Sequence, residues 1–535
     1  MATWNSTFQL VILLVFINQS TLSLLRLKKC ELSGSISKVP WGNLPDLFLL
    51  DLSSNKLSGN VPDSLGYLGN LRSLNLRDNS IVGPLPTSIG NLSRLEDLDL
   101  SLNMMDGIIP ESIGKLANLY SLNLEGNSWK GVITENHLQN LTKLEHLYLS
   151  SKSKSLVFNV KQDWMESFSL YTLEIIDCQL GPAFPSWLRT QGPLPLWSNS
   201  KAISLKSNLI SGPIPLNIGH EMTKLIGLEL SKNVLNGSIP PSMTEMKDLL
   251  FLDLSSNYLS RAIPPNWQSL KRLNYMDLSN NSLSGGIPRS ICSLPSLEWL
   301  KLSNNNLSEE LSLSLQDCTA GLSYLDLGGN RFFGTIPPIV ENLFNMSYLG
   351  LRSNMLIGDI PEQFCQFPNL HILDLAHNNL PGAIPRCLGN LEALKSMVTY
   401  NGSAKSPYLS LSFTEHLEMV VKGRQKEYFQ TFNDPSIYEG NAYLYGLPLT
   451  SNCSAADLGD AKDKNDEASS EKFWLYVGTA MGFIIGFWSI CGTLINKRSW
   501  RRAYFMFLDE TKDRLYVIIA VSVARFKRMA ALARI

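Results

Sequence analysis

The sequence is poor in histidine and cysteine, with six histidines and eight cysteines among 535 residues. Neither residue type recurs at the short spacings that bind zinc, so we expect no metal and no cofactor. The formal net charge of −1 gives no general affinity for nucleic acid. No Ser/His/Asp set, phosphate-binding loop or kinase motif is visible, and we therefore expect no enzymatic activity.

One unit repeats along most of the chain. Two copies of L-x-x-L-x-L-x-x-N-x-L-x-x-x-I-P follow one another in residues 249–288. The steps between copies are nearly equal, except for two longer ones in the degenerate stretch 151–208. A step of roughly 20–29 residues with this pattern is the signature of leucine-rich repeats. We call the N of this pattern the fixed position. It is found fifteen times, at Cys30, Asn55, Asn79, Asn103, Asn127, Ser151, Cys178, Asn208, Asn233, Asn257, Asn281, Asn305, Asn330, Asn354 and Asn378.

The physical properties of the unit predict the fold. Alternation in the L-x-L segment places leucines on one side of a short strand, and parallel stacking of the strands buries them. We expect the amide of the fixed Asn to satisfy backbone groups where the chain leaves the strand. The I-P dipeptide disfavours a regular helix on the way back. The fold class is thus an α/β-type leucine-rich-repeat solenoid, with parallel strands on the concave face and an irregular or 3-10 convex side.

The residue before the L-x-L of five successive repeats is aromatic. Parallel strands would align these rings as a ladder roughly 20 Å long on the concave side, at about 5 Å per step. Contiguous exposed aromatic rings mark binding surfaces, so we predict a ligand strip with exposed rings. The alternative is that the rings pack on each other and shield the leucines. The five residues are Phe251, Tyr275, Trp299, Tyr324 and Tyr348.

Aspartate also recurs at the centre of the strands. Paired carboxylates can cleave glycosidic bonds. The alternative, which we favour, is that L-D-L-S is part of the repeat consensus. The positions are Asp51, Asp99, Asp253, Asp277, Asp326 and Asp374.

Two cysteine pairs lie at similar depth on adjacent repeats. Cys292 and Cys318 follow the fixed Asn of their own repeats at nearly the same distance, and so do Cys365 and Cys387. Strands roughly 5 Å apart bring such positions within the reach of a disulfide. We predict the bonds Cys292–Cys318 and Cys365–Cys387, with four small buried apolar residues as the alternative.

An uncharged run occupies residues 473–495. As a helix it would be roughly 34 Å long, enough to cross a bilayer. Six acidic residues precede it in 457–472 and ten basic residues follow it in 496–535, so we expect the C-terminus in the cytoplasm. Within it, Gly478, Gly482 and Gly486 share one helix face and predict pairing with another span.

Ten glycosylation sequons all precede the predicted span, which agrees with that topology. Asn- and Ser-rich repeats also produce sequons by composition. Beyond Asn5 and Asn18 near the start, the candidates are Asn91, Asn140, Asn236, Asn280, Asn306, Asn345, Asn401 and Asn452.

These features divide the chain into seven parts. The first contains a short apolar run at 8–17 that is typical of a secretory signal, or alternatively of the tail of an earlier repeat. We expect a signal peptide at 1–23, repeats at 24–396, a non-repeat island at 397–428, a closing segment at 429–455, an acidic spacer at 456–472, a transmembrane helix at 473–495 and a basic tail at 496–535.

The repeat consensus, the island and the tail that begins Trp500-Arg501-Arg502-Ala503-Tyr504-Phe505 resemble plant leucine-rich-repeat receptor-like proteins. The group that is most similar comprises the receptors for fungal ethylene-inducing xylanase. The resemblance implies a single-pass type I receptor of the plasma membrane, with an extracellular N-terminus and no kinase. It would bind an extracellular protein, peptide or glycan elicitor and act in plant defence through adaptor and co-receptor kinases, with the glycine stripe contacting the adaptor. Tyr504 and Phe507 also fit Y-x-x-Φ, an endocytic sorting signal in the tails of this family, with a segment at the membrane interface as the alternative.

Three departures favour a shortened member of the family. The paired-cysteine N-terminal cap is absent, no repeats resume after the island, and Tyr445 replaces the closing cysteine, which leaves Cys453 without its expected partner. Two other functions therefore remain open. One is a decoy that binds without signalling, and the other is an inhibitor of microbial wall-degrading enzymes.

Overall fold

The computed structural model describes residues 22–161, 169–182, 184–185, 200–315, 318, 321–338, 345–391, 420–421, 424–425 and 435–449. The chain divides into two compact units, Met1–Asn452 and Cys453–Ile535, and every described residue belongs to the first. The predicted transmembrane helix, its glycine stripe and the basic tail lie outside the described residues. Among the residues that are described, no helix is long and apolar enough to cross a membrane.

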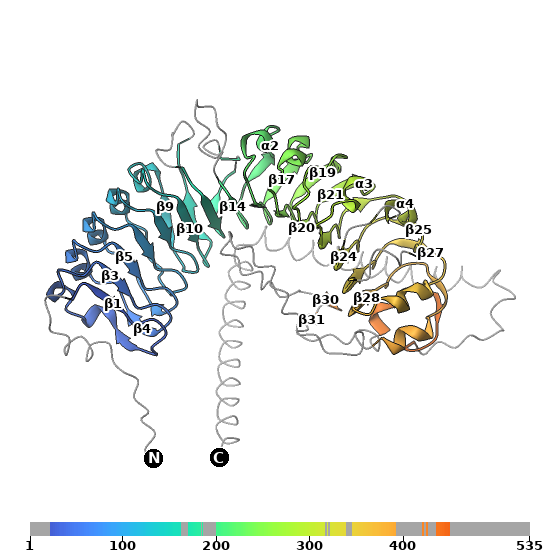
Figure 1. Cartoon of the computed structure of the whole chain (residues 1–535), viewed down its shortest axis with the longest axis horizontal. Coiled ribbons are helices and arrows are strands. Elements are labelled where there is room, and N and C mark those ends of the chain that lie inside the picture. Colours follow the sequence, from blue (N-terminus) through green and yellow to red (C-terminus); the bar gives the residue numbers. More distant parts are fainter. Residues whose placement is uncertain are drawn as a thin grey trace, which may run out of the picture. The chain divides into compact units, whose positions relative to one another are not determined.

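The first unit is built on one 15-stranded sheet, and every neighbouring pair in it is parallel. Its strands lie side by side in chain order along the inner side of the solenoid (Figure 1). The sequence prediction of a leucine-rich-repeat solenoid with a long parallel sheet is confirmed. The strands are β1 (Leu24–Arg26), β3 (Leu49–Asp51), β5 (Ser73–Asn75), β7 (Asp97–Asp99), β8 (Ser121–Asn123), β10 (His146–Ser150), β12 (Thr172–Ile176), β14 (Ala202–Ser204), β16 (Gly227–Glu229), β18 (Phe251–Asp253), β20 (Tyr275–Asp277), β22 (Trp299–Lys301), β24 (Tyr324–Asp326), β26 (Tyr348–Gly350) and β28 (Ile372–Asp374).

The register of the sheet aligns equivalent repeat positions. Leu252 pairs with Met276, which pairs with Leu300 on the following strand. All three are fully buried in a single hydrophobic core that runs from Leu25 to Leu444. Side chains at the alternate positions therefore share the opposite face of the sheet, the one directed away from the hydrophobic core. We call it the outer face of the sheet.

The fixed Asn joins each coil, meaning one turn of the solenoid, to the coil before it. Asn257 donates through Nδ2 to the carbonyls of Leu230, Leu254 and Ser255 at 3.0–3.1 Å. Its Oδ1 accepts the N–H of Leu235 at 3.0 Å. One buried side chain thus satisfies backbone groups on two coils, as the sequence predicts.

Short elements complete each coil. Three 3-10 helices, η3, η4 and η5, follow a proline that comes after valine, leucine and isoleucine respectively, in agreement with the irregular convex side expected from the sequence. The 3-10 helices are η1 (Ile36–Lys38), η2 (Trp41–Asn43), η3 (Asp63–Tyr67), η4 (Thr87–Asn91), η5 (Glu111–Lys115), η6 (Glu135–His137), η8 (Pro241–Glu245), η9 (Glu362–Gln366), η10 (Arg386–Asn390) and η11 (Pro435–Ile437), and the single-turn α-helices are α2 (Ile218–Glu221), α3 (Arg289–Cys292) and α4 (Leu311–Leu315).

Smaller sheets form where the chain turns away from the long sheet. The parallel groups are β2 (Ser33–Ser35), β4 (Lys56–Gly59) and β6 (Ser80–Ile81); β9 (Lys130–Ile133), β11 (Ser155–Phe158) and β13 (Gln179–Leu180); β15 (Ser211–Pro213), β17 (Val234–Gly237), β19 (Tyr258–Ala262), β21 (Ser282–Gly285) and β23 (Asn306–Leu307); β25 (Phe333–Thr335) and β27 (Met355–Ile357); and β29 (Pro381–Ala383) with β32 (Tyr443–Tyr445). An antiparallel pair joins β30 (Val420–Val421) and β31 (Arg424–Gln425).

Residues 435–449 form one further coil. Asn441 takes the fixed position, since its Nδ2 donates to the carbonyl of Leu375 and its Oδ1 accepts the N–H of Leu380. Strand β32 pairs in parallel with β29, as in the coils before it. The repeat pattern in the sequence predicts a closing segment here and does not reveal this coil.

Candidate ligand-binding surface

The five predicted aromatic residues lie in register on neighbouring strands, and we call them the aromatic ladder. Their pairings run from β18 through β20, β22 and β24 to β26. Consecutive ring centroids are 4.6, 6.2, 4.6 and 4.1 Å apart. The sequence spacing therefore places one ring above the next at the distance of stacked aromatic rings.

The expectation that these rings are exposed is wrong. Phe251 and Tyr324 are 4% exposed and Tyr275 and Tyr348 are 8% exposed, while Trp299 is partly buried. The physical reason is the strand spacing of about 4.8 Å, which brings the faces of adjacent rings into contact. The alternative stated above, in which the rings pack on each other, describes all five, and Trp299 differs from the other four only in being partly buried.

The recurring aspartates have a backbone role. In all six, Oδ1 accepts the N–H of the residue two positions later, at 2.9–3.2 Å. This bond closes the end of each strand, so L-D-L-S follows from the architecture of the coil. Lys301 is 3.5 Å from the Asp277 carboxylate, and the Tyr275 and Tyr324 rings lie 5.7 and 5.6 Å from its Nζ.

Burial changes the ionisation of this column of carboxylates. Burial, followed by the charges of Asp277 and Glu229, raises the pKa of Asp253 to about 7. Glu229 has Lys206 at 3.2 Å and Asp277 has Lys301, so basic side chains lie on both sides of Asp253. The centre of the sheet is therefore a buried charge network in which Lys206 pairs with Glu229 and Lys301 with Asp277, on either side of Asp253.

A second aromatic group, which the repeat pattern did not reveal, lies on β10 and immediately before β8 and β12. Tyr120 donates or accepts a hydrogen bond with His146 Nε2 at 3.1 Å, with ring centroids 5.1 Å apart. His146 stacks on Tyr148 at 6.3 Å and contacts Tyr171 edge-on at 5.6 Å. We call Tyr120, His146, Tyr148 and Tyr171 the tyrosine patch. Tyr120 is 44% exposed and the other three are partly buried, so the patch reaches the surface.

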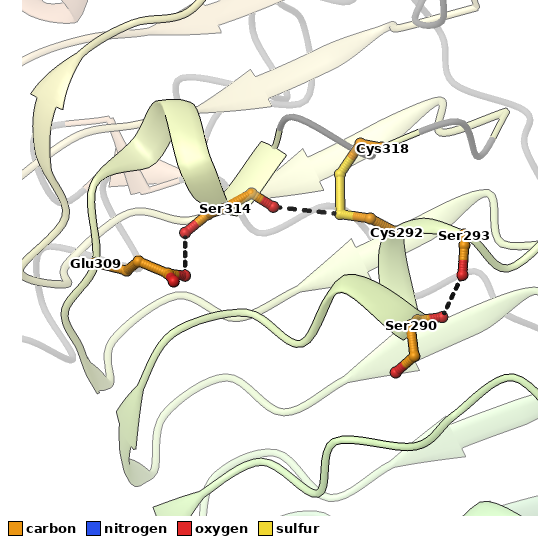
Figure 2. The surroundings of a disulfide bond; sticks show 6 residues. All are labelled: Ser290, Cys292, Ser293, Glu309, Ser314 and Cys318. Atoms are coloured by element: carbon orange, nitrogen blue, oxygen red, sulfur yellow. Dashed lines mark hydrogen bonds between the residues drawn. A yellow bond between two sulfur atoms is a disulfide. The ribbon is translucent and has the colours of Figure 1, made fainter.

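The two cysteine pairs predicted from their depth on adjacent coils are both joined by disulfides. The Cα atoms are 4.1 Å apart for Cys292–Cys318 and 5.6 Å apart for Cys365–Cys387. Figure 2 shows the first bond next to α4, where Cys292 Sγ is 3.6 Å from the carbonyl oxygen of Ser314. Cys30 and Cys178, which replace the fixed Asn, are free thiols.

Six of the predicted glycosylation sites are described, and each of these asparagines is exposed: Asn91, Asn140, Asn236, Asn280, Asn306 and Asn345. Exposure is a requirement for modification, which itself stays a prediction. Asn5, Asn18, Asn401, Asn452, the stripe Gly478, Gly482 and Gly486, and the sorting pair Tyr504 and Phe507 lie outside the described residues.

Comparison with known families finds leucine-rich repeats over much of the chain. The family described as a leucine-rich repeat region matches residues 17–197. Two further leucine-rich-repeat families match residues 261–307 and residues 248–270, 321–343 and 369–391. The matches extend across both the N-terminal coils and the coils of the aromatic ladder.

Similar sequences are receptor-like proteins of plants. The chain is 43% identical over 102 residues to receptor-like protein EIX2 of Solanum lycopersicum, a match that covers 18% of this chain and 10% of EIX2. It is 32% identical over 126 residues to EIX1 of the same plant, covering 20% of this chain and 12% of EIX1. The matched segments thus span only about a tenth of the length of these relatives.

Solved structures of plant receptors share the fold. The TDR receptor aligns with a TM-score of 0.64 and 29% identity, over 72% of this chain and 65% of its own. RGFR1 in complex with RGF2 aligns with a TM-score of 0.51 and 32% identity, over 70% of this chain and 55% of the RGFR1 chain. The Arabidopsis receptor kinase HAESA, in complex with the peptide hormone IDA and the co-receptor SERK1, aligns with a TM-score of 0.50 and 25% identity. The alignment covers 79% of this chain and 74% of the matched chain. The described coils are therefore a leucine-rich-repeat region of the plant receptor-like protein type, related over part of its length to tomato EIX1 and EIX2.

Proposed function

We propose that the repeat region is the ectodomain of a cell-surface receptor-like protein that binds an extracellular elicitor in plant defence. The observation that carries the proposal is the outer face of the long sheet, which presents equivalent side chains in register over fifteen strands. RGFR1 and HAESA, which share this fold, are described with peptide ligands. EIX2, which shares sequence with it, is a receptor-like protein.

In this proposal the chain is anchored in the plasma membrane by residues 473–495, with its N-terminus outside the cell. It acts by binding and not by catalysis, and it signals through partner receptor kinases. The HAESA structure contains the co-receptor SERK1, which supports a co-receptor as one partner. The stripe Gly478, Gly482 and Gly486 is the proposed contact with an adaptor kinase in the membrane.

The experiment is co-precipitation of the full chain with partner receptor kinases, with and without a panel of fungal secreted proteins. An elicitor-dependent gain of a kinase supports the proposal. Elicitor binding without a kinase would instead identify a decoy, and inhibition of a purified xylanase by the chain would identify an inhibitor. Gly482→Leu should weaken association with the adaptor kinase and leave elicitor binding unchanged.

Within the aromatic ladder, the proposed ligand contact is Trp299, because the other four rings are buried. Trp299→Ala should weaken elicitor binding by more than about 1 kcal/mol, the scale of an interface hot spot. A fall in the thermal melt with unaltered binding would assign Trp299 to packing alone.

A further inference from the structure

The outer face of four consecutive coils differs in charge from the coils on both sides. The segments 96–101, 120–125, 145–150 and 171–176 contain no lysine or arginine. The segments before and after them, 72–77 and 201–206, each contain two basic residues. The four segments carry six carboxylates, at Glu96, Asp97, Asp99, Glu125, Glu145 and Glu174. Of these, Glu96 pairs with Arg72 at 3.0 Å and Glu174 is fully buried, which leaves the other four on this face.

The tyrosine patch lies within this acidic zone. Ser121 pairs with Asp97 on one side and with His146 on the other, so the three share a row across β7, β8 and β10. Asp99 and Tyr148 share the next row in the same way, through Asn123. Two inter-strand steps correspond to about 10 Å, so different arginine side chains of one extended peptide can contact the ring and the carboxylate.

The carboxylates next to the patch favour a cation. Burial, followed by the charges of Asp99 and Asp51, raises the pKa of Asp97. The hydrogen bond that Asp97 accepts from Ser73 acts in the opposite direction and lowers this pKa. Burial and then the Glu145 carboxylate raise the pKa of Tyr120. Both shifts arise first from burial and then from neighbouring negative charge, and a positive ligand would relieve the second of these causes.

Aromatic rings beside carboxylates fit one side chain particularly well. The guanidinium of arginine stacks on tyrosine and histidine rings and pairs in its plane with a carboxylate. A neutral sugar would stack on the rings but leave the carboxylates uncompensated. The four strands span about 14 Å, the length of four to five residues of extended peptide.

We propose that the tyrosine patch, with Asp97, Asp99 and Glu145, is the binding site for an extended arginine-containing segment of an extracellular peptide or protein. This inference rests on the proposed recognition function and specifies its ligand class. It places the principal contact on β7, β8, β10 and β12, away from the buried part of the aromatic ladder. Arginine side chains lie over Tyr120 and His146, and their guanidinium groups pair with the carboxylates around them.

The test measures binding of a fluorescent peptide, Arg-Gly-Arg-Gly-Arg, to the full chain in neutral detergent. The matched probe replaces each arginine by citrulline, which keeps the shape and removes the charge. We expect the arginine peptide to bind at least about tenfold more tightly, with the difference shrinking as NaCl rises from about 0.05 to about 0.3 M. Equal binding of the two peptides would overturn the proposal.

Two sets of variants locate the site. Asp97→Asn/Glu145→Gln should weaken the arginine peptide about tenfold, since a charge pair at the surface contributes up to about fivefold, and Glu145 is exposed while Asp97 is half-buried. The control Asp46→Asn/Asp63→Asn removes two exposed carboxylates outside these strands and should change binding by less than about twofold. Equal losses in both would mean non-specific attraction and would refute the assignment.

The rings are tested separately from the charges. Tyr120→Ala should weaken the arginine peptide about fivefold and Tyr120→Phe should retain it, because only the ring stacks on the guanidinium. Binding of chitohexaose that depends on Tyr120 and not on the carboxylates would overturn the ligand class in favour of a glycan. A fungal elicitor that binds the chain while the arginine peptide does not would leave the proposed function standing and refute this inference alone.

Discussion

The last fixed Asn of the regular series offers a matched pair of substitutions. Asn378 is buried, whereas Asn379, one residue later, is exposed. Asn378→Ala removes the donor to the carbonyls of Leu351, Leu375 and Ala376, and the acceptor of the Leu356 N–H. Asn379→Ala removes an amide at the surface.

The cost of Asn378→Ala follows from the partners that remain. The Leu351 carbonyl keeps Asn354 Nδ2, and the Leu375 carbonyl keeps Asn441 Nδ2. The Ala376 carbonyl keeps the N–H of Ser353. The Leu356 N–H, by contrast, loses the acceptor that the amide provided. Leaving one buried N–H donor without an acceptor costs about 1–3 kcal/mol. We therefore expect Asn378→Ala to lower the free energy of unfolding by about 2 kcal/mol.

Urea unfolding and hydrogen exchange measure this difference. Asn379→Ala should change the free energy of unfolding by less than about 0.5 kcal/mol, as for other surface substitutions. The Leu356 amide should exchange about thirtyfold faster in Asn378→Ala, since about 1.4 kcal/mol corresponds to a factor of ten. Equal behaviour of the two variants, or an unchanged Leu356 amide, would refute the role given to the fixed Asn.

Three further substitutions test the packing and charge of the solenoid. Tyr324→Ala should lower the free energy of unfolding by about 3 kcal/mol, because Tyr324 stacks between two rings; an unchanged melt would contradict the packing role. Asp253 has a pKa raised from its ordinary value of 3.8 to about 7, so its contribution to stability is full below pH 3.8 and lost as the pH rises through about 7. Asp253→Asn should therefore gain stability relative to the parent chain between about pH 4 and about pH 7 in parallel urea titrations, and a constant difference would count against this. Cys365→Ala/Cys387→Ala should cost about 2–4 kcal/mol under oxidising conditions, and a loss of the same size in excess reductant would show that the bond is not the cause.

Repetition in the sequence was enough to predict the parallel sheet and its register, because a fixed period aligns every equivalent residue. The same alignment gave the two disulfides from the depth of their cysteines. Asn441 escaped notice because it follows Asn378 by more than two repeat lengths in place of one. The coil that contains it becomes evident only from its pairing with β29.

The site was less accessible than the fold, for physical reasons that differ between the two aromatic groups. The rings of the aromatic ladder occupy one repeat position, so the sequence placed them in line but did not reveal that stacking buries them. Tyr120, His146 and Tyr148 occupy three different positions of the motif on two coils. No single column of the repeat shows them, and the charge difference between neighbouring segments is the signal that could have located them.

Each fixed Asn bonds to its own coil and to the one before it, which gives assembly of the solenoid a direction. A newly synthesised coil keeps an open N–H, such as that of Leu235, until the Asn of the following repeat emerges. Each new repeat therefore completes the hydrogen bonding of the coil before it. The coil whose backbone groups are still unsatisfied is always the one nearest the C-terminal end of the nascent chain. For the coil of β28 the wait is much longer, because Asn441 arrives only after residues 392–434 have been synthesised.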